Sequence, residues 1–153
     1  MHDYKEKEFK NINAGDLGLE TEEEKKAAEE TANENKDLFE EIKKDLNGKV
    51  KEVKVNPTPA GLPVTLTAEG GISMEMEKVL RRMPNAEGVE STKVLELNPN
   101  HTVFAALKAA HAAGDTDKVA KYAELLYDQA LLIAGLPIED PVAYAQLVCG
   151  LMQ

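Results

Sequence analysis

The stretch that decides the fold is residues 116–153, TDKVAKYAELLYDQALLIAGLPIEDPVAYAQLVCGLMQ. It predicts a helix that is capped by Asp115 or Thr116 and runs to about 134, where a glycine and a proline end it. A second helix is predicted over 141–152, with Asp140 as its N-cap. The second helix carries no charged side chain. Because a bilayer span takes about 20 residues, this helix is too short to cross a membrane and must pack against protein.

The helix over 116–134 has more apolar surface than one core can cover. One stripe can face the core of the domain, and Leu125 and Leu132 form a second stripe beside it. A second copy of the same helical pair would cover that stripe in a two-fold four-helix bundle, so the pattern predicts a homodimer. The alternative is a monomer with a buried terminal hairpin. The expected core stripe comprises Val119, Tyr122, Ala123, Leu126, Ala130 and Ile133. The predicted dimer contacts are Tyr122, Leu125, Leu126, Gln129, Leu132, Ile133, Tyr144, Leu147, Val148 and Leu151.

The rest of the chain predicts a small sheet with helices packed on it. β-Branched and alternating apolar residues predict three strands, the first two joined by a proline-rich loop, over 50–55, 64–68 and 93–97. The expected helices cover 21–46, 73–83 and 100–113. Together with the terminal pair, this order is typical of an α+β fold. Residues 1–19 show no sustained period and are predicted to be a linker, followed by one domain over 20–153.

Cap signals set the ends of these helices. Thr21 and Glu24 form a capping box at the start of the first helix, and Gly48 supplies its left-handed stop. The apolar stripe of this helix is narrow at its start, so we expect its first half to project into water and its second half to pack. Asn100 is the expected N-cap of the helix that ends near Ala113.

Composition excludes several functions. A chain of 153 residues can form one modest core, and its net charge of −10, from 28 acidic and 18 basic side chains, argues against binding to nucleic acid or to an anionic membrane. The single Cys149 cannot form an internal disulfide, and the N-terminus lacks the apolar stretch of a secretory signal. We therefore expect a cytoplasmic protein.

Candidate catalytic and metal-binding residues are few and scattered. His101 and His111 have no Cys or carboxylate at ligand spacing, and Cys149 has no His within a helical turn. The glycine pair 70–71 is not followed by the Lys-Ser or Lys-Thr of a phosphate loop, and the acid pair 139–140 is explained by helix capping. We expect no catalytic residue, no metal site and no bound cofactor.

The short helix after the glycine pair is rich in methionine. Met is unbranched and polarisable, so it suits surfaces that must accommodate varied apolar partners. The flanking glycines and Pro84 are expected to leave this helix loosely tethered. Its apolar stripe would pack on the sheet in the simplest interpretation, and Met74 falls on the opposite, charged side, where we expect exposure. The candidate binding residues are Ile72, Met74, Met76, Val79, Leu80 and Met83.

Three blocks of sequence carry a resemblance to a known family. They are EGGISMEMEKVL over 69–80, VLELNPNH over 94–101, and a segment over 122–141 that contains LYDQALL. In these blocks the chain resembles the C-terminal domain of the ninety-kilodalton heat-shock chaperones in their bacterial, HtpG-type form. YKEKEFKNI, over 4–12, resembles the connection from that family's middle domain, whereas the loop at 56–61 departs from the family pattern.

The resemblance implies a function in protein folding and stress response. In that family ATP and Mg are bound by other domains, so it implies that this fragment holds no cofactor and has no ATPase activity. It implies homodimerisation through the last two helices, and contact between unfolded or partly folded client proteins and the methionine-bearing helix. The competing interpretations of the residues are a free-standing dimeric adaptor or assembly module, and a small enzyme.

Overall fold

Two short strands lie near the N-terminus, β1 (Asp3–Tyr4) and β2 (Lys7–Glu8), and their backbones pair antiparallel. They fall in the segment for which the sequence predicted a linker. Besides these two strands, the computed structural model describes residues 22–56, 61–70, 72–84 and 91–152. The expected cap at Thr21 lies outside the described residues.

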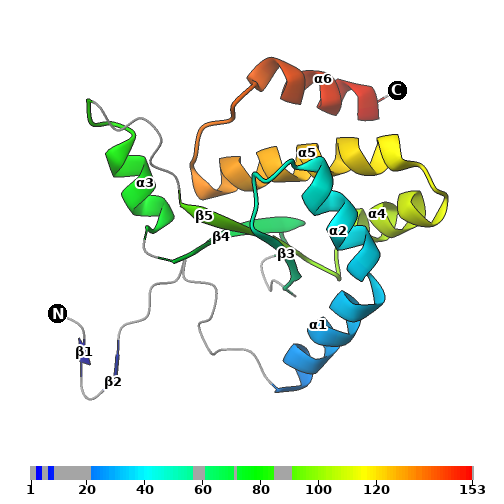
Figure 1. The fold of residues 1–153 in the computed structure, drawn as a ribbon, viewed down its shortest axis with the longest axis horizontal. Coiled ribbons are helices and arrows are strands. Elements are labelled where there is room, and N and C mark those ends of the chain that lie inside the picture. The colour runs from blue at the N-terminus through cyan, green and yellow to red at the C-terminus, as the bar shows by residue number, and fades with distance from the viewer. Residues whose placement is uncertain are drawn as a thin grey trace.

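Within the described residues the main sheet has three strands, and together with the helices it confirms the predicted α+β class (Figure 1). Leu95, at the centre of the middle strand, is paired with Val53 on one side and Leu66 on the other, and all three side chains are buried. The middle strand runs parallel to the first edge strand and antiparallel to the second. In sheet order the strands are β3 (Glu52–Val55), β5 (Thr92–Leu97) and β4 (Val64–Glu69).

The first predicted helix is two helices, α1 (Glu22–Glu34) and α2 (Lys36–Asp45), which meet at Asn35. The Asn35 side-chain amide donates a 2.7 Å hydrogen bond to the carbonyl of Thr31. The backbone N–H of Asn35 donates to the same carbonyl at 3.2 Å, so the side-chain amide shares this acceptor with the helical bond. Gly48 has a positive φ of +82°, as predicted, but the left-handed stop begins one residue earlier, at Asn47, whose φ is +50° directly after the C-cap Leu46. No described residue of α1 is buried, whereas α2 buries Leu38, Phe39 and Ile42.

The helix α4 (Thr102–Ala112) is capped by His101, whose Nδ1 accepts a hydrogen bond from the backbone N–H of Val103 at 3.2 Å. The prediction that Asn100 caps this helix was wrong. Its backbone N–H donates instead to Oδ1 of Asn98 at 3.0 Å, which forms a turn and delays the start of the helix.

The terminal helices begin and end where the sequence predicted. α5 (Thr116–Ala134) begins after the N-cap Asp115 and ends at Gly135. The φ of Gly135 is +73°, in the left-handed region that favours glycine. The α6 helix (Pro141–Leu151) follows the N-cap Asp140, whose carboxylate accepts hydrogen bonds from two backbone N–H groups of the first turn. The cap residues were therefore reliable guides here.

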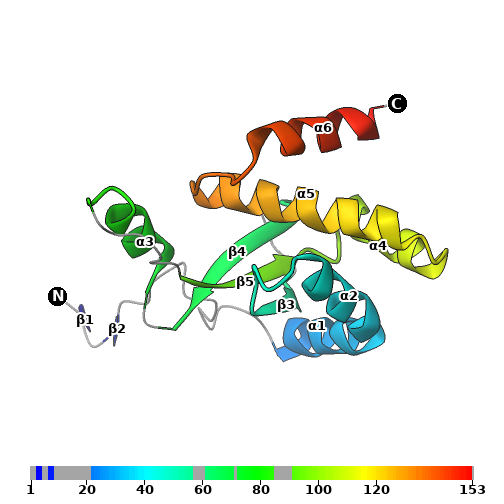
Figure 2. The same cartoon turned by 45° about the horizontal axis from the view of Figure 1, so that its top comes forward.

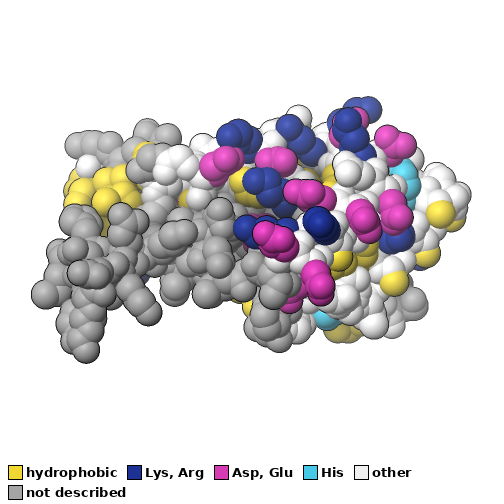
Figure 3. Space-filling model, turned by 90° about the horizontal axis from the view of Figure 1, so that it is seen from below, with side chains coloured by type: hydrophobic (Ala, Val, Ile, Leu, Met, Phe, Trp, Pro, Cys, Tyr) yellow, Lys and Arg dark blue, Asp and Glu magenta, His cyan; other side chains and the backbone are white. Residues whose placement is uncertain are grey.

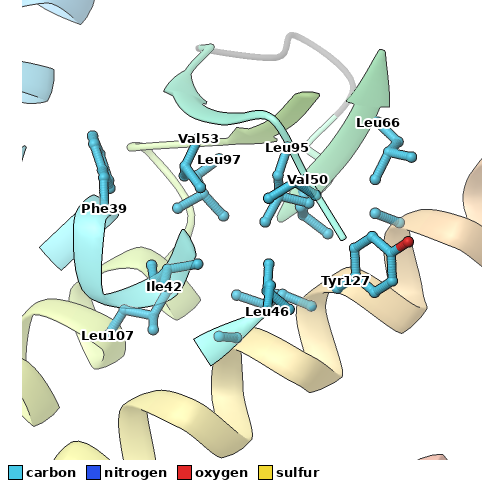
Figure 4. Packing of buried hydrophobic residues seen from close by; sticks show 14 of the residues in the cluster. Phe39, Ile42, Leu46, Val50, Val53, Leu66, Leu95, Leu97, Leu107 and Tyr127 are labelled. Carbon is cyan, nitrogen blue, oxygen red and sulfur yellow. The ribbon is translucent and has the colours of Figure 1, made fainter. Parts of the chain in front are cut away.

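α5 is the central helix of the fold. It packs along β4 and against α2 and α4, and α6 lies on its far side from the sheet (Figures 1 and 2). Figure 4 shows side chains of α2, α4, α5 and the strands meeting in one apolar cluster. Burying one such side chain stabilises the fold by about 1.5–3 kcal/mol. Among the described residues, none from α6 belongs to this cluster. The labelled members are Phe39, Ile42, Leu46, Val50, Val53, Leu66, Leu95, Leu97, Leu107 and Tyr127.

Candidate functional site

The outer surface of α5 and α6 is apolar and open. No described residue of α6 is buried, and its Val142 and Leu151 side chains are 66% and 50% exposed. Leu132 and Ile133, near the end of α5, are 50% and 46% exposed. A groove of about 310 Å³ lies between the two helices, with Leu125 and Leu147 among its lining residues. An exposed apolar surface of this kind is typical of a protein contact site.

The predicted dimer contacts divide into three groups. The exposed ones are Leu132, Ile133 and Leu151. The half-buried ones are Tyr122, Gln129, Tyr144, Leu147 and Val148. Leu125 and Leu126 are buried within the protomer, and Leu126 belongs to the core cluster.

Ile133 does not face the core, contrary to the prediction for its stripe. At this end of α5 the core positions are taken by Leu131 and by Leu136, which folds back after Gly135. The backbone N–H of Leu136 donates a 2.8 Å hydrogen bond to the carbonyl of Leu131 and fixes this return. Ile133 is consequently turned toward solvent.

The methionine-bearing helix is α3 (Met74–Leu80), which projects from one end of the sheet, away from α1 and α2 (Figures 1 and 2). Met74 was predicted to be exposed, but only 2% of it is exposed, because this side of α3 packs into the core cluster. Ile72 and Leu80 are half-buried. The exposed apolar side chains are Met76, Val79 and Met83, at 51%, 51% and 54%.

A buried carboxylate holds α3 against the sheet. Glu77 has no exposed surface, and its Oε2 accepts hydrogen bonds from the backbone N–H of Ser91 at 3.0 Å and from its hydroxyl at 2.6 Å. The Lys93 ammonium lies 3.2 Å from the same oxygen, and Arg81 donates to Oε1 at 3.0 Å. Burial opposes ionisation of Glu77, but the Ser91 hydrogen bonds and the Lys93 charge together lower its pKa below the ordinary value. The loose tether predicted for this helix was therefore wrong.

Sequence reasoning missed Glu77. Its partners at Ser91 and Lys93 lie across a long connection, so no local spacing marks them as neighbours. A lysine within the predicted third strand was the one available signal, because a charged side chain in a buried strand needs an opposite charge.

Beside Glu77 lies a polar hollow of about 340 Å³ between α3 and the turn that joins α5 to α6. Lys49 and Glu139 form a 3.0 Å ion pair at its edge. Nearby, Asp128 of α5 is buried. Its burial, with the negative charge of Glu124 as the next largest cause, raises the pKa of Asp128 above the ordinary value.

The two histidines considered as candidate sites have structural contacts. His111 Nδ1 lies 2.7 Å from a carboxylate oxygen of Glu41, His101 caps a helix, and Cys149 is exposed. The described part of the chain contains no group of three or more His, Cys, Asp or Glu side chains that could hold a metal ion. In the same residues, no helix has the length and apolar character needed to cross a membrane. On the face shown in Figure 3, basic and acidic side chains are interspersed.

The proteins that this chain resembles are chaperones. The chain belongs to the Hsp90 protein family, whose model matches residues 1–153. A relative named chaperone protein HtpG, from Halalkalibacterium halodurans, is 54% identical over 97% of this chain. HtpG proteins of Bacillus subtilis and Clostridium botulinum are 48% and 49% identical, over 97% and 100% of it. The chain spans 24% of the length of each of these relatives.

Proposed function

We propose that this chain is the C-terminal dimerisation domain of an HtpG-type chaperone. In this proposal α5 and α6 of two copies form a four-helix bundle, and α3 of each copy contacts unfolded or partly folded client proteins. ATP and Mg bind elsewhere in the full-length chaperone, so the fragment itself is not an enzyme and holds no cofactor. The assembly acts in the cytoplasm.

The observation that carries the proposal is α6. The α6 helix has no charged side chain, and each of its described residues is at least partly exposed. This exposure is unfavourable in water, because apolar area costs about 25 cal/mol for each Å² left uncovered. The groove between α5 and α6 has apolar walls at Leu125 and Leu147, which a side chain from a second helical pair could fill. A second copy is the favoured occupant because it brings an identical apolar surface, as two-fold interfaces require.

The client-contact role of α3 is supported by its exposed side chains. Met76, Val79 and Met83 form an apolar surface that flexible thioether side chains can adapt to different partners. Two copies of α3 in one dimer would let a single client engage two weak sites and gain avidity.

A charge placed on the exposed face of α6 tests the dimer. Leu151→Glu alters a side chain that is 50% exposed in the protomer but would bury an unpaired carboxylate in the bundle. We expect size-exclusion chromatography with light scattering to give a dimer for the wild type and a folded monomer for this variant. Ala105→Glu, on the exposed side of α4, is the control and should remain a dimer. If the Leu151→Glu variant is still a dimer, Leu151 does not lie in the interface.

A further inference from the structure

The rotation of α3 about its own axis decides which of its apolar side chains meet water. Met74 faces the core and is 2% exposed, whereas Met76 is 51% exposed. α3 has only 7 residues, and helices shorter than about 12–15 residues are marginal on their own. Its orientation must therefore be set by contacts with the rest of the domain.

Apolar contacts alone define this orientation poorly, because they have no directional preference. Glu77 lies one turn after Met74, on the same inward side, and its hydrogen bonds are directional. Ser91 contributes both its backbone N–H and its hydroxyl, and it lies next to the start of β5. Rotation of α3 would withdraw the carboxylate from these donors and leave the Lys93 ammonium, which is 5% exposed, without its partner.

A second side chain of α3 lies close to a different element of the domain. Lys78 lies beside the last turn of α5, since a Cβ atom built on Gly135 would be 3.1 Å from the Lys78 Nζ atom. A cation is favourable at the C-terminal end of a helix, where backbone carbonyls are left without helical partners. Glu77 is thus bonded to residues beside and within β5, and the neighbouring Lys78 places its ammonium close to the end of α5.

We propose that Glu77 is the positioning residue of α3: its buried carboxylate, bound by Ser91 and Lys93, fixes the rotation of the helix so that Met76 and Val79 face solvent. This inference about the orientation of α3 rests on the contacts described above and not on the proposed function. Only the identity of what meets Met76 and Val79 rests on the proposed client-binding function.

Cysteine reactivity measures the rotation directly. In a Cys149→Ser background, which removes the one native thiol, a cysteine is placed at Met74 or at Met76, and its reaction rate with a maleimide is followed. With Glu77 intact we expect the cysteine at 76 to react at least about tenfold faster, because the one at 74 is reached only after local opening. In Glu77→Gln the two rates should come within about threefold of each other. Glu75→Gln, at an exposed glutamate of the same helix, is the matched control and should keep the tenfold ratio.

An unchanged ratio in Glu77→Gln would overturn the proposal. If Glu77→Gln does not fold, as judged by circular dichroism, Ser91→Ala gives the test, since it removes the 2.6 Å hydroxyl bond and leaves the ion pair with Lys93 in place. A smaller fall of the ratio is expected for Ser91→Ala, in a domain that circular dichroism shows to be folded, and no change in the ratio would again contradict the positioning role.

Binding of a fluorescent, permanently unfolded model protein separates this inference from the proposed function. If Glu77→Gln equalises the two reaction rates and also weakens that binding, both are supported. If it equalises the rates and leaves binding unchanged, Glu77 positions α3 as inferred, but α3 is not the client-contact surface.

Discussion

Leu126 and Leu132 lie on the same helix in opposite environments: Leu126 is 2% exposed, inside the core cluster, and Leu132 is 50% exposed. This difference separates the core of the protomer from its proposed interface. Leu126→Glu should unfold the domain because it buries an unpaired charge in the core. Leu132→Glu should leave the protomer folded, with cooperative melting, and convert the dimer to a monomer. Circular dichroism melts and sedimentation of both variants check this, and a dimeric Leu132→Glu would exclude Leu132 from the interface.

Met76→Ser together with Val79→Ser should weaken binding to a model unfolded protein without unfolding the domain. Both side chains are about half exposed, so their removal costs little packing energy. Met74→Ser is the contrasting control, since truncating a buried methionine costs about 2–5 kcal/mol. Fluorescence anisotropy gives the binding and thermal melts give the stability. A large loss of stability in the double variant would show that the stripe is part of the core.

Asp128→Asn should stabilise the domain at neutral pH. Burial and the nearby Glu124 raise the pKa of Asp128, so the folded state favours its protonated form, and stability is lost as the pH rises from the ordinary pKa through the raised one. The asparagine removes that loss. For a chain of this size, a gain of about 1 kcal/mol raises Tm by about 2–4 °C. The gain in stability should disappear in melts at a pH below the ordinary pKa of aspartate. If the variant is still more stable there, the pKa of Asp128 is not the cause of the gain.

Isothermal titration of the isolated chain with Mg-ATP should give no heat of binding at micromolar protein. Helix N-termini and glycine-rich loops bind phosphate when basic side chains accompany them, and the glycine pair 70–71 has no following lysine in its turn. Micromolar affinity would instead reveal a nucleotide site within this chain.

The helix boundaries near the C-terminus could be predicted because local signals determine them. Asp115 and Asp140 cap the helices, and Gly135 ends the first of them, each through bonds or dihedral angles of its own segment. The break at Asn35 could also have been predicted from a local signal, because asparagine is unfavourable in a helix interior. It was missed because apolar residues continue at helical spacing on both sides of Asn35.

The orientation of α3 could not be predicted, because distant residues determine it. On a helical wheel, Met74 shares a side with Glu77 and Arg81, and a side with charges is normally exposed. That side is inward here because Ser91 and Lys93 supply donors to the Glu77 carboxylate. The same limit applies to Ile133, whose exposure depends on the return of Leu136 to the core.

Sedimentation equilibrium of the wild-type chain at micromolar concentration tests the central claim most directly. A two-fold contact through α5 and α6 should bury on the order of 1,600 Å² or more, enough for a stable dimer at that concentration. The predicted result is a particle of twice the 16.7 kDa chain mass. A single species of 16.7 kDa would contradict the account, because the apolar surface of α6 would then have no partner copy to cover it.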